Sequence, residues 1–159
     1  MKNVKKILSV SSLAVVLAMV MLMFTGCTKT STTTDAFKTL AEESGLITAD
    51  ATAQFAEYDF VKEVTLAISE DQSYQFEFYV LSDQERAKAF FEDNKNLFEE
   101  SLTGIYSQSS VTGKNYAQYS ATTDTEYKFI EYIDTTVLYI NVDKAYKNEA
   151  EDFIKGLGY

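Results

Sequence analysis

The sequence predicts a single α+β domain in which helices pack on one face of an antiparallel sheet, giving two layers. Apolar and polar residues alternate in several segments of strand length, and elsewhere apolar residues recur at helical spacing. Two stretches, Val64–Asn94 and Lys128–Leu157, share the order strand, polar turn, strand, cap and amphipathic helix. Two such hairpin–helix units joined side by side form one sheet with helices on one face.

A first helix is predicted at the start of the folded part, which we expect to span residues 35–159. Asp35 is a suitable cap, and Phe37 lies on the apolar face of the helix. Gly45 is a plausible end for this helix. The next residues, 46–60, are ambiguous and fit a short strand and a turn of helix around Ala51–Ala56.

The clearest hairpin of the chain follows. Residues 64–68 and 74–80 alternate in polarity and flank the polar break Glu70-Asp71-Gln72. Ser82-Asp83-Gln84-Glu85 then matches a capping box, which predicts a helix that ends near Gly104. The inward residues expected for this helix are Ala87, Phe90, Phe91, Asn94, Leu97, Phe98 and Ser101.

The last part of the chain predicts three more strands and a helix. Residues 105–111 are polar on both faces, which suits an edge strand or a loop, and 116–121 fit a strand. Segments 126–133 and 136–142 form a second strong hairpin around Asp134-Thr135. Asp143 is expected to cap a final helix with inward residues Tyr146, Ala150, Phe153, Ile154 and Leu157.

The first 26 residues have the layout of a secretory signal peptide. Residues 1–6 carry three lysines, Ile7–Phe24 is apolar apart from three serines, and the small residues Thr25-Gly26 precede Cys27. This order resembles the lipobox of bacterial lipoproteins, although Phe24 replaces the aliphatic residue favoured there. By that resemblance the signal is removed and a diacylglyceryl group is attached to the thiol of Cys27. Cys27 then becomes the mature N-terminus.

The alternative is an uncleaved membrane span, because an apolar run of 18 residues is near the lower limit for crossing a bilayer. Both interpretations place residues 28–159 outside the cytoplasm, on the cell membrane of the envelope. The chain resembles the small uncharacterised lipoproteins common in AT-rich Gram-positive bacteria. This resemblance covers only the N-terminal segment, so it implies no functional residue in the folded part. Residues 27–34 are expected to be the lipidated cysteine and a flexible polar tether.

Composition limits the chemistry of the folded part. All 24 acidic residues lie in 27–159 with 11 of the 14 basic ones, so this part has a net charge of −13. Binding to nucleic acid is not expected, because phosphate contacts need clustered Lys and Arg. The chain has no His and a single Cys, which excludes the usual general base and an intrachain disulfide. We therefore expect neither an enzyme nor a metal or other cofactor.

Two groups of residues are weighed as functional candidates. The first is a tyrosine-rich segment that suits sugar stacking or protein contact, or else belongs to the core: Tyr106, Tyr116, Tyr119, Tyr127 and Tyr132. The second is a set of adjacent acids that are expected on solvated surfaces: Glu42-Glu43, Glu70-Asp71, Glu92-Asp93, Glu99-Glu100 and Glu151-Asp152.

The sequence favours a membrane-anchored, non-catalytic binding or interaction module of the cell envelope. Its expected partners are membrane lipid, through Cys27, and an envelope protein or glycan. One alternative is a small-ligand receptor for a sugar, peptide or cation that works with a transport system. A further alternative is an envelope hydrolase, which needs two carboxyl groups about 5–10 Å apart in a cleft.

Overall fold

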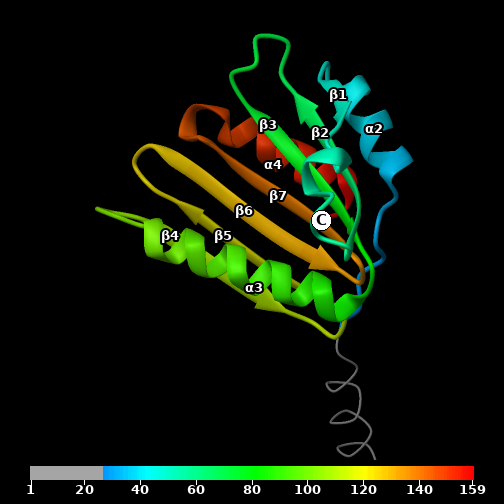
Figure 1. Ribbon diagram of the computed structural model, residues 1–159. Coiled ribbons are helices and arrows are strands. Elements are labelled where there is room, and N and C mark those ends of the chain that lie inside the picture. Colours follow the sequence, from blue (N-terminus) through cyan, green and yellow to red (C-terminus); the bar gives the residue numbers. More distant parts are fainter. Residues whose placement is uncertain (1–26) are drawn as a thin grey trace, which may run out of the picture.

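The computed structural model describes residues 27–159, which form a seven-stranded sheet with the strand order β1-β2-β3-β7-β6-β5-β4 (Figure 1). The predicted signal peptide, 1–26, lies outside the described residues. The strands are β1 (Ile47–Asp50), β2 (Val61–Ile68), β3 (Gln75–Leu81), β4 (Ser107–Thr112), β5 (Tyr116–Thr122), β6 (Glu126–Ile133) and β7 (Thr136–Asp143). The helices are α2 (Thr34–Glu43), α3 (Gln84–Ser101) and α4 (Lys147–Leu157), with the short 3-10 turns η1 (Thr52–Phe55) and η2 (Lys144–Tyr146).

The predicted α+β class and the single antiparallel sheet are confirmed. Every neighbouring pair of strands is antiparallel. The two predicted hairpin–helix units are β2-β3-α3 and β6-β7-α4, and they meet where β3 pairs with β7. The ambiguous segment 46–60 contains both a short strand, β1, and a helical turn, η1.

The central strands are apolar on both faces of the sheet. Along β3, Phe76 and Phe78 belong to one buried cluster, whereas Tyr79 and Leu81 belong to the other. Because successive side chains of a strand point to opposite faces, the two clusters lie on opposite sides of the sheet. Each face therefore needs a covering layer.

Helices α2 and α4 share one face, as the prediction of helices on one face expects. Phe37 of α2 stacks on Phe78, and Phe153 of α4 contacts the ring of Phe76. Helix α3 adds a layer that the sequence did not predict, because its residue Phe91 packs on Tyr132 in the opposite cluster. Figure 1 shows α3 in front of the sheet, towards its β4–β5 side, with α4 behind the sheet. The sandwich therefore has three layers, because the second apolar face also has to be covered.

The helix ends differ slightly from the predicted ones. Thr33, rather than Asp35, caps α2, and its hydroxyl accepts a hydrogen bond from the amide of Ala36. Asp83 caps α3 as the capping-box pattern expects. Leu97, predicted to point inward, is 62% exposed, because it lies beside the narrow buried stripe of α3 rather than on it.

Candidate functional site

Cys27 lies at one end of the sheet, beside the turn that joins β4 to β5. It is exposed, and its carbonyl accepts a hydrogen bond of 3.3 Å from the amide of Lys114. The turn also contains Asn115, whose carbonyl accepts from the amide of Asp134 in the β6–β7 turn. Cys27 therefore lies next to two tight turns at the same end of the sheet.

The segment from Cys27 to Thr33 is docked along the domain, although the sequence predicts a flexible tether there. The amide of Lys29 donates to Asn115 Oδ1 at 3.1 Å, and Asn115 Nδ2 donates to the carbonyl of Lys29 at 2.8 Å. The backbone N–H and C=O of Lys29 thus both bond to one partner, as they would to a neighbouring strand. Here the partner is the side-chain amide of Asn115 instead of a backbone. Asn115 therefore offers a matching donor and acceptor to the backbone of Lys29, a contact that the prediction of a flexible tether does not include.

The side chain of Lys29 reaches a buried carboxylate on β6. Lys29 Nζ lies 2.6 Å from Oε1 of Glu131 and 5.0 Å from the centre of the Tyr116 ring. Glu131 is 0% exposed, and its second oxygen, Oε2, has no hydrogen-bond partner. Burial raises the pKa of Glu131, and the hydrogen bond and charge of Lys29 oppose that rise. The N-terminal segment therefore contributes the cation that this buried acid needs.

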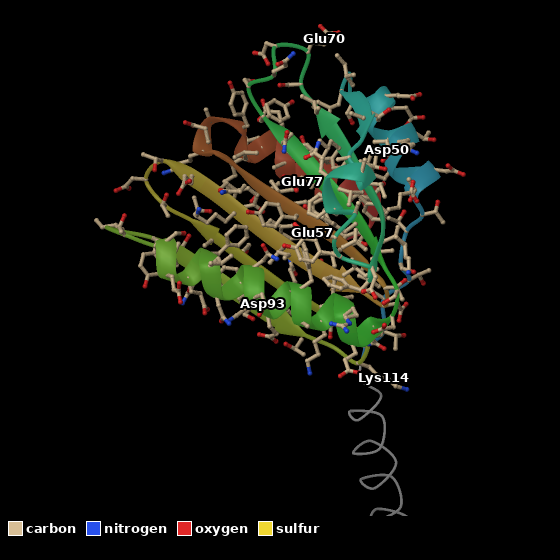
Figure 2. All side chains as sticks on the ribbon, in the orientation of Figure 1. Asp50, Glu57, Glu70, Glu77, Asp93 and Lys114 are labelled. Atoms are coloured by element: carbon tan, nitrogen blue, oxygen red, sulfur yellow. The ribbon has the colours of Figure 1, made fainter. Side chains whose placement is uncertain are left out.

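A groove lies at the opposite end of the sheet, in and beside the β2–β3 loop. One cavity of about 240 Å³ is bordered by Tyr74, Phe76 and Phe153, together with Glu149 and Asp152 of α4. An adjoining hollow is lined by residues that include Glu70, Asp71, Ser73, Tyr74 and Tyr146. Neither lining contains Lys or Arg. Figure 2 shows Glu70 and Lys114 at opposite ends of the molecule.

The aromatic rings of this groove are partly open to solvent. The centres of the Tyr74 and Tyr146 rings lie 4.6 Å apart, and both side chains are half-buried. Burial, followed by the negative charges of Glu149 and Asp71, raises the pKa of Tyr74, so its hydroxyl stays protonated at neutral pH. Ring faces and carboxylates together favour a cationic group over an anionic one.

The five tyrosines of the predicted recognition segment do not form one surface. Tyr116, Tyr119, Tyr127 and Tyr132 are each at most 7% exposed, whereas Tyr106 is 47% exposed. Tyr127 lies in the cluster under α4, but Tyr119 and Tyr132 lie in the cluster under α3. Burial raises the pKa of Tyr127 to about 12. Four of the five tyrosines are therefore core residues, which was the alternative to a recognition surface.

The adjacent acidic pairs lie on solvated surfaces, as predicted. Both members of all five pairs are exposed. No group of three or more His, Cys, Asp or Glu in the part of the chain that the structure describes could hold a metal ion. Glu149 and Asp152 border one cavity, but both are exposed to water. Such carboxylates suit ion binding better than general acid catalysis, which needs a desolvated acid.

Sequence reasoning missed Lys29 and Glu131. A signal existed for the acid, because Glu131 interrupts the apolar run Phe129–Ile133 in a strand that is buried on both faces. Lys128, the other buried charge of β6, is satisfied on the opposite face by Asn141 and Glu126. Nothing in the sequence linked Glu131 to a lysine 102 positions away.

Within residues 27–159, none of the helices has both the length and the apolar character needed to cross a bilayer. Comparison with known proteins gives no relative. No family model, curated protein or solved structure matches the chain.

Proposed function

We propose that the protein is a lipid-anchored, extracytoplasmic binding module of a bacterial cell envelope and has no catalytic activity. The observation that supports this best is the position of Cys27 beside Lys114, at the end of the sheet opposite the groove at Tyr74. An anchor at Cys27 leaves the groove facing away from the membrane. The two acyl chains of a diacylglyceryl group would hold the protein durably, whereas one chain binds only marginally.

The docked N-terminal segment supports a fixed orientation rather than free tumbling on a tether. Lys29 is two residues from Cys27, and it is held by Asn115 and Glu131. A strand of seven residues such as β3 spans about 20 Å, so the groove would stand at least that far from the anchored end. The net charge of −13 for residues 27–159 would keep the domain from lying flat on anionic lipid.

The experiment for this proposal compares the native protein with Cys27→Ser in cells fed a radiolabelled fatty acid. We expect the native chain to carry label, to lack residues 1–26 by mass spectrometry, and to sediment with membranes. The Cys27→Ser variant should carry no label. An unlabelled native chain that keeps residues 1–26 and stays in the membrane would instead support the uncleaved span. An unlabelled native chain found outside the membrane would refute anchoring altogether.

A second candidate function is that of a receptor for a small cationic ligand. It is favoured by the lining of the cavity of about 240 Å³, in which Tyr74 lies with other aromatic rings and the charged residues, Glu149 and Asp152, are both acidic. Spermidine and an uncharged disaccharide are suitable probes in isothermal titration. Spermidine binding that weakens in Asp152→Asn and in 0.5 M salt would support this function. Binding of the disaccharide alone, or of neither probe, would remove it.

The hydrolase alternative has less support than either. Glu149 and Asp152 are the two acids that line the cavity of about 240 Å³, and both are exposed to water. Hydrolysis of glycan by the native protein, abolished in both Glu149→Gln and Asp152→Asn, would overturn the non-catalytic assignment.

A further inference from the structure

Strand β4 is an open edge of the sheet. It pairs with β5 on one side, and no other strand of the described chain pairs with its second side. All six residues, Ser107–Thr112, are exposed. They include no charged residue and no proline, and the pairing with β5 runs without a bulge. Natural edge strands usually carry charged residues, prolines or bulges, because these features prevent other chains from pairing with the edge.

The other edge of the sheet, β1, is protected. It has only four residues and ends in Asp50. The chain turns directly from Asp50 into η1, so little backbone is left for a further strand. The contrast indicates that the exposure of β4 is particular to this side of the domain.

The register shows which backbone groups of β4 are available. The amide of Gly113 donates to the carbonyl of Tyr116 across the two-residue turn, so these two residues form a hydrogen-bonded pair. Such pairs recur at every second residue of an antiparallel ladder. The amides and carbonyls of Gln108, Ser110 and Thr112 therefore point away from β5.

Two cavities flank this edge, one on each face of the sheet. One of about 440 Å³ lies under α3 and includes Thr112 and Tyr132, and the other of about 250 Å³ lies beside α4 and includes Ser107 and Tyr127. An added strand directs successive side chains to opposite faces. A residue paired with Thr112 would reach the first cavity, and one paired with Ser107 would reach the second. Such alternate pockets are what gives strand addition its specificity.

We propose that β4 is a docking edge for an extended, uncharged segment of another polypeptide, which adds to the sheet as an eighth strand. An uncharged partner fits because Ser107–Thr112 carries no charge and the charged residues that line the two cavities include both signs. Residues 27–159 as a whole would repel an acidic chain. This inference deepens the proposed function by naming the binding surface and the kind of partner.

A second copy of the chain fits this edge less well, on the premise that Cys27 is anchored. Two copies that paired antiparallel through β4 would be related by a two-fold axis. Because Cys27 lies beside Lys114, just past the end of β4, the two anchors would then lie at opposite ends of the paired strands. If the strands stand perpendicular to the membrane, the two anchors cannot both enter the same membrane.

Hydrogen exchange of the peptide 105–115 tests the proposal. The full chain is measured as purified lipoprotein in liposomes and in membranes from the producing cells. We expect exchange at the outward amides of Gln108, Ser110 and Thr112 to be at least tenfold slower in the native membranes. Ser110→Pro should abolish the slowing, because it removes an outward amide without breaking a bond to β5. Ser110→Lys, which adds a charge to the edge, is a second blocking variant if the proline variant does not fold.

Three results would overturn the proposal. Equal exchange in both samples would mean that no strand is added. Slowing that appears already in liposomes and increases with protein concentration would identify a second copy as the partner. Slowing that persists in both blocking variants would mean that something other than a strand covers β4. Fatty-acid labelling of the same samples reports separately on the anchor, so failure of the proposed function is distinguishable from failure of strand addition.

Discussion

Lys29 Nζ lies 2.6 Å from Oε1 of Glu131, and this ion pair joins the N-terminal segment to the centre of the sheet. The side chain of Lys29 is 29% exposed, whereas that of Glu131 is 0% exposed. Loss of the ion pair therefore affects the two residues differently. Water can solvate the ammonium group of Lys29, but it cannot reach the carboxylate of Glu131. The proposed anchor and the core are connected through this contact.

Lys29→Ala is expected to lower the free energy of unfolding by about 1–3 kcal/mol, since it leaves a buried carboxylate without its cation. The figure lies below the usual cost for a fully buried pair because Lys29 is partly exposed and the segment can move aside. Urea unfolding at pH 7 measures the change. The double variant Lys29→Met with Glu131→Leu should recover most of the loss. An unchanged midpoint in Lys29→Ala would mean that the segment is not docked in solution.

The stability of the native protein should fall as pH rises above the usual carboxyl range, relative to Glu131→Gln. Burial raises the pKa of Glu131 in the fold above its ordinary value of 4.5, so the folded state keeps this proton to higher pH than the unfolded chain does. The contribution is full below pH 4.5 and is lost as pH rises through the folded pKa. Unfolding of both proteins from pH 4 to 8 tests this. A native advantage that grows with pH would show that the Lys29 ion pair outweighs burial.

The strands and helices of this chain could be predicted because their patterns are local. The alternation in β2, β3, β6 and β7, and the cap at Asp83, depend on neighbours in sequence. The layer formed by α3 could not be predicted, because strands buried on both faces do not indicate which face a following helix covers. The same limit hid the contact of Lys29 with Glu131, which joins distant parts of the chain.

Replacing Tyr119 and replacing Tyr106 with alanine should change the free energy of unfolding by very different amounts. Tyr119 is 1% exposed and donates a hydrogen bond of 2.9 Å to Gln108 Oε1, so Tyr119→Ala should cost about 3–5 kcal/mol. Tyr106 is 47% exposed, and Tyr106→Ala should stay within about 0.5 kcal/mol. Thermal unfolding of the two variants compares them. Equal losses would contradict the division of these residues between core and surface.

Two positions of α3, Phe91 and Leu97, test the face that this helix buries. Phe91 is 2% exposed and packs on Tyr132, so Phe91→Ala should cost about 3–5 kcal/mol. Leu97 is 62% exposed, and Leu97→Ala should have almost no effect, although the sequence pattern places it inward. The denaturant midpoints of the two variants give the answer. A larger loss for Leu97→Ala would mean that α3 is rotated about its axis.

Gly113→Ala is expected to release the N-terminal segment as well as to destabilise the fold. A Cβ at this position would lie 2.0 Å from Cε1 of Tyr116, so the tyrosine ring has to move. That ring lies beneath the ammonium group of Lys29, and its displacement removes one side of the site that holds the lysine. The overpacking should cost about 1–3 kcal/mol.

Limited digestion with trypsin after Lys29 separates this effect from a general loss of stability. The docked lysine should be cleaved slowly in the native protein and faster in Gly113→Ala. Gly45→Ala is the matched control, because Gly45 has a φ of +75° with no atom within 4 Å of an added Cβ. It should lose about 1 kcal/mol through backbone strain and leave cleavage after Lys29 unchanged. Equal cleavage rates in the two variants would mean that the Tyr116 ring does not help to hold the segment.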